Sequence, residues 1–149
     1  MSIGIMPGGF NLLHAGHLAA FEYAKQYCDY LIVVVVRDQS IRGHKLIQEP
    51  IEDRYLKLRA VKWVDEVIPC ESEEHLLELL KLLNYDYYFL SEEYKDSFEE
   101  GKKIIGEDNL VYTPRKHNWS TTNEVEKIVR LYTKNKSPNL RDKRRKTKT

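Results

Sequence analysis

A short stretch near the start of the chain decides the fold, and it reads Pro7-Gly8-Gly9-Phe10-Asn11-Leu12-Leu13-His14-Ala15-Gly16-His17. An apolar strand candidate, Ser2–Met6, runs into it, and apolar residues at helical spacing begin directly after it, at Leu18. Glycines at such a strand-to-helix turn let the backbone approach a phosphate closely, and the helix start adds N–H groups with a partial positive charge. The stretch therefore predicts a nucleotide-phosphate site. It is neither a Walker A loop, since no Gly-Lys-Ser/Thr follows, nor a GxGxxG fingerprint.

Within this stretch, His14 and His17 flank Gly16 at the start of the predicted helix. Two imidazoles at this spacing can face one phosphate, and two positioned N–H donors stabilise the charge that builds on a phosphate under in-line attack. The small residues Ala15 and Gly16 leave room for a nucleotide. Such a pair can also be a helix cap, a solvated pair or a metal site. The order of strand, glycine turn, histidine pair and helix favours the phosphate site.

The composition fits one compact domain in the cytoplasm. A chain of 149 residues with 42% hydrophobic and 11% aromatic content can bury one core but is too short for two ordinary domains. No segment approaches the ~18 apolar residues of a membrane span, and the start lacks the basic-then-apolar layout of a signal peptide. Cys28 and Cys70 lie in no CxxC or Cys/His cluster, so we expect reduced, buried thiols.

The net charge of +1 hides an asymmetry between the body and the end of the chain. Residues 134–149 hold eight Lys or Arg against Asp142 alone, which leaves sixteen basic and twenty-two acidic residues elsewhere. A basic end can bind nucleic acid or anionic lipid, but solvated ends of this kind are common. We expect a domain over residues 1–134 and a basic, disordered tail over 135–149. The acidic body argues against nucleic acid as the partner.

Apolar segments alternate with helix-like ones along the chain, which is typical of βαβ units and a parallel sheet. The predicted strands are Ser2–Met6, Tyr30–Arg37, Asp65–Pro69, Tyr87–Leu90 and Leu110–Tyr112. The uninterrupted β-branched run Val33–Val36 suits a strand that is covered on both faces.

Helical spacing of apolar residues predicts three crossover helices, marked by Leu18-Phe21-Ala24-Cys28, by Leu56-Arg59/Ala60-Trp63 and by Leu76-Leu79-Leu80-Leu83. A last helix is expected to begin near Thr121, where Thr121-x-x-Glu124 forms a capping-box pattern. Its apolar stripe is expected to face the core, and it consists of Val125, Ile128, Val129 and Tyr132.

These motifs resemble the HxGH nucleotidyltransferases and, among them, the cytidylyltransferases typified by the glycerol-3-phosphate enzymes. Gly9–His17 resembles GxFDxxHxGH, with Asn11 where an Asp is usual, and Arg54 matches an arginine before the third strand. Lys62–Ile68 resembles the RYVDEVI segment. Pro114-Arg115 with Trp119–Thr122 resembles the PR…ISTT segment, whose hydroxyls and helix N-terminus hold the β- and γ-phosphates. After the fourth strand, Ser91-Glu92 stands where those enzymes have Gly-Asp.

The resemblance implies a single three-layer, Rossmann-like α/β domain with a five-stranded parallel sheet in the order 3-2-1-4-5. It implies catalytic roles for His14, His17 and Arg115. The nucleotide-binding residues would be Gly8, Gly9, Phe10, Asn11, Gly16, Arg54, Lys62, Ser91, Glu92, Ser120, Thr121 and Thr122. Arg42 and Lys45, in the loop after the second strand, and Arg115, which can hold a phosphate bidentately, would bind the acceptor.

The implied reaction is transfer of CMP from CTP to a phosphorylated small alcohol or polyol, with release of pyrophosphate. Mg²⁺ is expected to arrive with the nucleoside triphosphate, and no residue is assigned as its ligand. A homodimer is implied as well. Adenylyl transfer to a sugar 1-phosphate is the alternative, because Ser120–Asn123 also resembles that branch. A non-catalytic nucleotide- or RNA-binding module is a weaker alternative, since the chain has no KMSKS-like segment.

Overall fold

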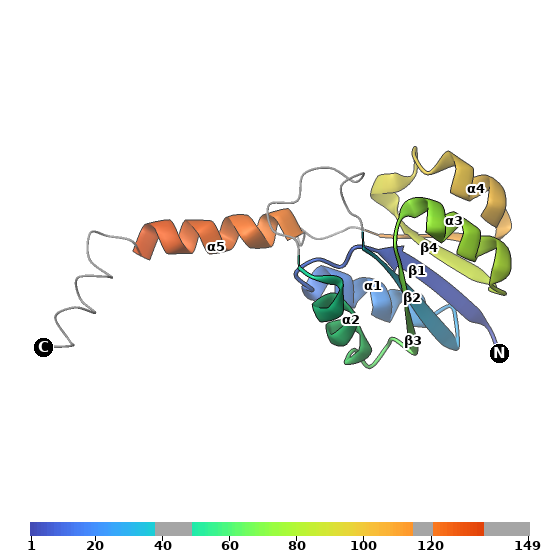
Figure 1. Cartoon of the computed structure of the whole chain (residues 1–149), viewed down its shortest axis with the longest axis horizontal. Coiled ribbons are helices and arrows are strands. Elements are labelled where there is room, and N and C mark those ends of the chain that lie inside the picture. The colour runs from blue at the N-terminus through green and yellow to red at the C-terminus, as the bar shows by residue number, and fades with distance from the viewer. Residues whose placement is uncertain (38–48, 115–120, 136–149) are drawn as a thin grey trace, which may run out of the picture.

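The computed structural model describes residues 1–37, 49–114 and 121–135 of the chain. Its centre is a sheet of five parallel strands in the order β3-β2-β1-β4-β5 (Figure 1). The strands are β1 (Ile3–Gly8), β2 (Tyr30–Val36), β3 (Glu66–Cys70), β4 (Tyr87–Ser91) and β5 (Leu110–Thr113). The predicted fold class and strand order are confirmed.

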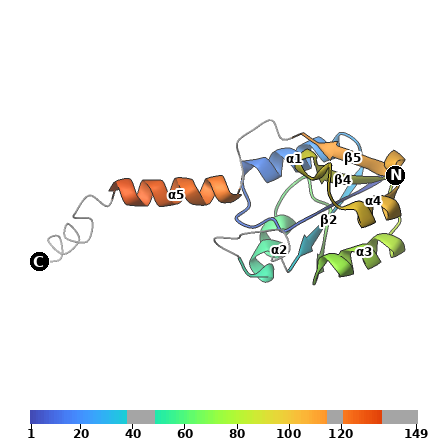
Figure 2. The same ribbon diagram turned by 90° about the horizontal axis from the view of Figure 1, so that it is seen from above.

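Helices cover both faces of this sheet, which makes three layers (Figures 1 and 2). They are α1 (Ala15–Lys25), α2 (Ile51–Arg59), α3 (Glu73–Leu82) and α4 (Glu99–Ile105), and α5 (Thr121–Asn135) follows the last strand. Phe21 of α1 and Leu58 of α2 belong to the core on one face. Leu76 of α3 and Ile105 of α4 belong to the core on the other face.

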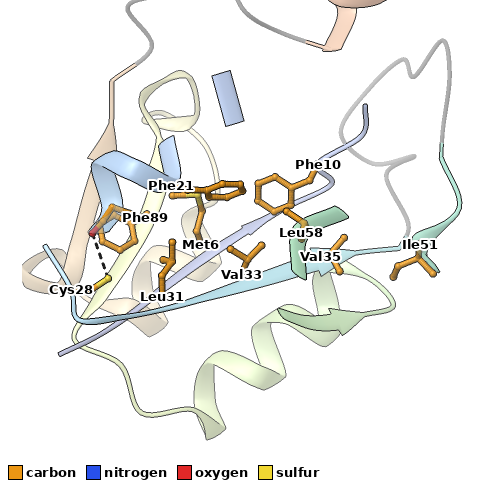
Figure 3. Packing of buried hydrophobic residues seen from close by; sticks show 11 residues of the cluster. Met6, Phe10, Phe21, Cys28, Leu31, Val33, Val35, Ile51, Leu58 and Phe89 are labelled. Carbon is orange, nitrogen blue, oxygen red and sulfur yellow. Dashed lines mark hydrogen bonds between the residues drawn. The ribbon is translucent and has the colours of Figure 1, made fainter. Parts of the chain in front are cut away.

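β2 supplies side chains to both cores because successive residues of a strand point to opposite faces. Leu31, Val33 and Val35 lie beside Phe10 and Phe21 on the side of α1 and α2 (Figure 3). The alternate residues face α3 and α4, and these are Ile32, Val34 and Val36. All six are buried, which confirms the prediction of a strand covered on both faces.

The ends of the strands differ from the predicted ones by one or two residues, and one helix was not predicted. β1 continues two residues beyond Met6, because Pro7 and Gly8 still pair with β2, so the turn begins at Gly9. The helix α4 was not predicted, since its seven residues are too few to show a helical period. Gly101 lies within α4, where a Cβ would stand 1.9 Å from the Phe98 ring, so the helix packs closely on that residue.

The predicted packing of α5 on the core is wrong. The helix starts at Thr121 as expected, and Val125 is 4% exposed. The rest of the apolar stripe is more than half exposed, with Ile128 at 59%, Val129 at 55% and Tyr132 at 58%. Both views show α5 extending away from the sheet, so the body does not cover the stripe at Ile128, Val129 and Tyr132 (Figures 1 and 2).

Two expectations from composition can be compared with the fold. Cys28 and Cys70 are buried thiols, as predicted, and burial raises the pKa of Cys28 above its usual value. Within the described part of the chain, no helix has both the length and the apolar character that crossing a membrane would require.

Candidate active site

The turn between β1 and α1 is held in an unusual backbone conformation. Phe10 and Leu12 have positive φ angles of 50° and 49°, a left-handed conformation that residues other than glycine rarely adopt. Asn11, between them, is 2% exposed. A Cβ on Gly8 would stand 2.9 Å from the Phe10 ring, so glycine at this position lets the ring fold back beneath the turn.

Phe10 joins the turn to the helix that follows it. Its ring centroid lies 5.4 Å from that of Phe21 in α1, and the two rings lie side by side in the core (Figure 3). The same ring meets His17 edge-on, at 5.4 Å and an interplanar angle of 71°. The hydrophobic core therefore supports the His17 imidazole from below.

The side chains of His14 and His17 form a reciprocal capping box at the N-terminus of α1. His14 is the N-cap residue, and its Nδ1 accepts a hydrogen bond from the Gly16 backbone N–H at 3.1 Å. Nδ1 of His17 accepts one from the His14 backbone N–H at 3.2 Å. The two rings stack, with centroids 3.8 Å apart and an interplanar angle of 25°. The structure thus brings the two predicted catalytic histidines together.

This arrangement fixes the position of the protons on both rings. A nitrogen that accepts a hydrogen bond carries no proton, so each neutral imidazole must hold its proton on Nε2. The pair therefore carries two Nε2–H donors on stacked rings at the N-terminus of a helix, where the backbone N–H groups and the helix dipole also favour an anion. Such donors suit oxygens that gain negative charge during phosphoryl transfer.

Arg54 lies beneath the turn and supports it. The residue is 1% exposed, and burial lowers the pKa of its guanidinium below its usual value. Its N–H groups donate to four backbone carbonyls, at distances of 2.7–3.2 Å, and these belong to Gly9, Val36, Arg37 and Glu49. The sequence predicted a nucleotide-binding Arg54, whereas the structure shows it connecting the turn, the end of β2 and the start of α2.

Other predicted site residues fall at both edges of the sheet. Ser91 ends β4 and pairs with Thr113, so it and the adjoining Glu92 lie at the carboxyl edge, as does Gly8 at the end of β1. Gly16 is buried in the first turn of α1. Lys62 lies at the opposite edge, in the connection from α2 to the start of β3, and its ammonium sits over the Trp63 ring, 4.8 Å from the centroid. The structure does not bring Lys62 to the histidine pair.

The predicted acceptor-binding residues Arg42, Lys45 and Arg115 lie outside the described residues, and so does Ser120, which was predicted to bind the nucleotide. Thr121 and Thr122 begin α5, but the described side chains of that helix start at Val125.

Two residues beside the turn were not predicted from the sequence. The Glu49 carboxylate accepts a hydrogen bond from the Leu12 backbone N–H and forms an ion pair with Lys57. No motif marks Glu49, and it stands 37 positions from Leu12, so only the folded chain brings them together.

Comparison with known proteins identifies the family. The cytidylyltransferase-like family model matches residues 5–138, which is most of the chain. The chain belongs to the cytidylyltransferase-like family. Glycerol-3-phosphate cytidylyltransferase from Bacillus subtilis is 34% identical over 128 residues, covering 85% of this chain and 97% of that relative.

Other proteins similar to this chain carry different names. FAD synthase from Pyrococcus horikoshii is 31% identical over 137 residues, covering 86% of this chain and 93% of that relative. The crystal structure of a lipopolysaccharide core biosynthesis protein from Thermoplasma volcanium is 25% identical, with a TM-score of 0.59 over 80% of this chain and 99% of that one. Several relatives are named cytidylyltransferases or FAD synthases, so this cytidylyltransferase-like protein is a nucleotidyltransferase.

Proposed function

We propose that this nucleotidyltransferase transfers CMP from CTP to a phosphorylated small alcohol or polyol and releases pyrophosphate. The observation that carries the proposal is the pair of Nε2–H donors of His14 and His17 at the start of α1, because both imidazoles accept backbone hydrogen bonds through Nδ1. The similarity to a glycerol-3-phosphate cytidylyltransferase supports the choice of CTP and of a phosphate-ester acceptor.

In the proposed reaction, a phosphate oxygen of the acceptor attacks the α-phosphorus in line. The bond from that phosphorus to the β-phosphate oxygen breaks, and pyrophosphate leaves with the electron pair. The histidines donate hydrogen bonds to the α-phosphate oxygens, where charge increases in the transition state. Nucleophile and leaving group are both phosphate oxyanions, so no general base is required.

The remaining roles belong to the same proposal. Arg115, Arg42 and Lys45 would bind the acceptor phosphate, and Ser120, Thr121 and Thr122 would bind the β- and γ-phosphates. Mg²⁺ bound to the triphosphate would neutralise part of the charge of the leaving pyrophosphate. The Glu49 carboxylate beside the turn is engaged by Leu12 and Lys57, which fits a metal carried by the phosphates better than one held by this carboxylate.

Adenylyl transfer is the second candidate, and a specific observation favours it. FAD synthase from Pyrococcus horikoshii matches over 93% of its length, and FAD contains an adenylyl group. The acceptor would then be FMN or, as the sequence motifs suggest, a sugar 1-phosphate. Asn11 and Ser91-Glu92 differ from the residues of the glycerol-3-phosphate enzymes. These positions are predicted to contact the nucleotide, so the differences are compatible with a base other than cytosine.

A substrate panel tests both candidates. With Mg²⁺, pyrophosphate release is measured for CTP, ATP, GTP and UTP against glycerol 3-phosphate, ribitol 5-phosphate, phosphocholine, phosphoethanolamine, FMN and a heptose 1-phosphate. A pocket that hydrogen-bonds cytosine rejects other bases by about 1–3 kcal/mol for each buried group left unpaired. CTP should therefore be preferred by about tenfold or more. A preference for ATP with FMN or the sugar phosphate would overturn the cytidylyl assignment.

The homodimer and the cytoplasmic location remain predictions of the same proposal. Sedimentation equilibrium on the full chain at several concentrations tests the first, and a monomer at working concentration would reject it.

A further inference from the structure

The carboxylate of Glu49 joins the turn before His14 to the helix α2. One carboxylate oxygen, Oε1, accepts a hydrogen bond from the Leu12 backbone N–H at 2.5 Å. The other, Oε2, forms an ion pair with the ammonium of Lys57. The Glu49 side chain is 12% exposed, whereas that of Lys57 is 46% exposed. A nearly buried carboxylate thus touches the turn that leads to the histidine pair.

The backbone of Glu49 holds the same turn by two further contacts. Its N–H donates to Oδ1 of Asn11 at 2.8 Å, so Asn11 and Leu12 are both tied to this one residue. Its carbonyl accepts from Nε of Arg54 at 3.0 Å, and another N–H of that guanidinium donates to the Gly9 carbonyl at 2.9 Å. Side chain and backbone of Glu49 therefore act together on the turn.

The turn needs such support because of its conformation. Phe10 and Leu12 have the left-handed backbone conformation, which residues other than glycine keep only where the surrounding structure holds them. Leu12 lies two residues before His14, so a change in its φ would rotate the chain that leads into the N-cap. The hydrogen bond from His14 N–H to His17 Nδ1 would then be lost or lengthened, and it fixes the His17 proton on Nε2.

The negative charge of Glu49 would repel an anionic ligand, because the carboxylate lies next to the proposed phosphate site. The ion pair with Lys57 offsets this charge. The helix α2 begins at Ile51, directly after Pro50, and its last turn brings the Lys57 ammonium back to Glu49. The net charge of the Glu49–Lys57 pair is therefore close to zero.

We infer that Glu49 is a positioning residue for the histidine pair: it holds Leu12 and Asn11 so that both Nε2–H groups face the nucleotide, while Lys57 cancels its charge. This inference rests on the proposed function of His14 and His17. A residue that served stability alone would change the free energy of unfolding without changing the tautomer of either histidine or separating kcat from KM.

Four variants test the inference. In Glu49→Gln, an oxygen acceptor for Leu12 remains, so kcat should stay within about threefold of the wild type. In Glu49→Ala, the contact is lost, and misplacement of reacting groups by about 1 Å should lower kcat by about 10–100-fold with little change in the KM for nucleotide. Glu52→Gln, an exposed carboxylate in the first turn of α2, is the matched control and should behave as the wild type.

The fourth variant, Lys57→Met, tests the charge. It leaves the carboxylate unpaired beside the phosphates, so the KM for nucleotide should rise by about 3–10-fold while kcat changes little. Combining it with Glu49→Gln removes the charge and should restore the KM. An unchanged KM in Lys57→Met, or no restoration in the double variant, would overturn the part of the inference that concerns charge.

Nitrogen-15 NMR of the imidazoles gives a readout that needs no activity. Wild-type His14 and His17 should show an unprotonated Nδ1 and a protonated Nε2 at a pH where both rings are neutral, and Glu49→Ala should show a mixture of tautomers at His17. Unchanged tautomers and an unchanged kcat would overturn the positioning role. If no substrate reacts, the proposed function fails, while the NMR result still decides whether Glu49 positions the pair. If Glu49→Ala does not fold, Glu49→Asp, whose shorter side chain draws the acceptor oxygen away from the Leu12 N–H, takes its place in the kcat and NMR measurements. Lys57→Met and its combination with Glu49→Gln then still test the charge from the KM.

Discussion

The turn between β1 and α1 and the helix α5 are opposite cases within one chain. The turn contains two residues in the left-handed conformation, yet the guanidinium of Arg54, in α2, and the carboxylate of Glu49, just before α2, hold it. The helix α5 has regular geometry and a clear apolar stripe, yet Val125 alone among its described side chains is buried. A good local pattern is therefore no guide to how firmly a segment is held.

The physical reason is the surface that each segment meets. α1 follows the turn directly and lies over the sheet, where Phe21 is completely buried. α5 follows β5, the last strand, and extends away from the sheet (Figure 1). Amphipathic pattern stabilises a helix only where another element covers the apolar face.

The largest expected effect is on catalysis at the turn. Replacing His14 or His17 by Ala should lower turnover by about 10²–10⁴-fold, because each removes a donor that stabilises transition-state charge. The fold should survive, with a loss of about 1 kcal/mol for the His14 variant because its helix cap is removed. Pyrophosphate release and thermal unfolding measure the two effects.

His75→Ala is the matched control for the histidine variants. His75 is exposed in α3 and its Nδ1 accepts only a local hydrogen bond from Glu71 N–H in the described contacts, so its loss should leave turnover unchanged. Turnover within a few-fold of the wild type in His14→Ala or His17→Ala would remove the central claim about the site.

The next effect is on stability beneath the turn. Arg54→Met should lower the free energy of unfolding by about 3 kcal/mol or more, because it leaves buried backbone carbonyls of three segments without their donors. Arg59→Met, exposed on the same helix, should change it by about 0.5 kcal/mol or less. Urea denaturation gives both values. A small loss for Arg54→Met together with a raised KM for nucleotide would instead favour the nucleotide contact predicted from the sequence.

Much of the fold could be predicted because its determinants are local. The β-branched run of β2 indicated a strand buried on both faces, and the spacing of His14 and His17 after a glycine turn indicated a site at the start of α1. Glu49 could not be predicted, because its partners Asn11 and Leu12 are distant in sequence and no residue type marks the contact. The sheet order came from the resemblance, not from periodicity.

Arg54 and α5 show two different limits of prediction from the sequence. A family motif placed Arg54 near the nucleotide, but a motif does not tell whether a guanidinium faces the ligand or the backbone behind it. The stripe of α5 gave the helix correctly, but the surface against which a helix packs depends on the chain direction after β5, which no local pattern contains.

The smallest expected effect is on α5. Ile128→Lys and Val129→Lys should each change the free energy of unfolding by about 0.5 kcal/mol or less, since both side chains are already more than half exposed. Leu58→Ala, in the core beside the turn, should cost about 2–5 kcal/mol. Urea denaturation at two protein concentrations gives both values. A loss of about 2 kcal/mol or more for the α5 variants at both concentrations would mean that α5 packs on its own body in solution. A loss confined to the higher concentration would mean that a second copy covers the helix.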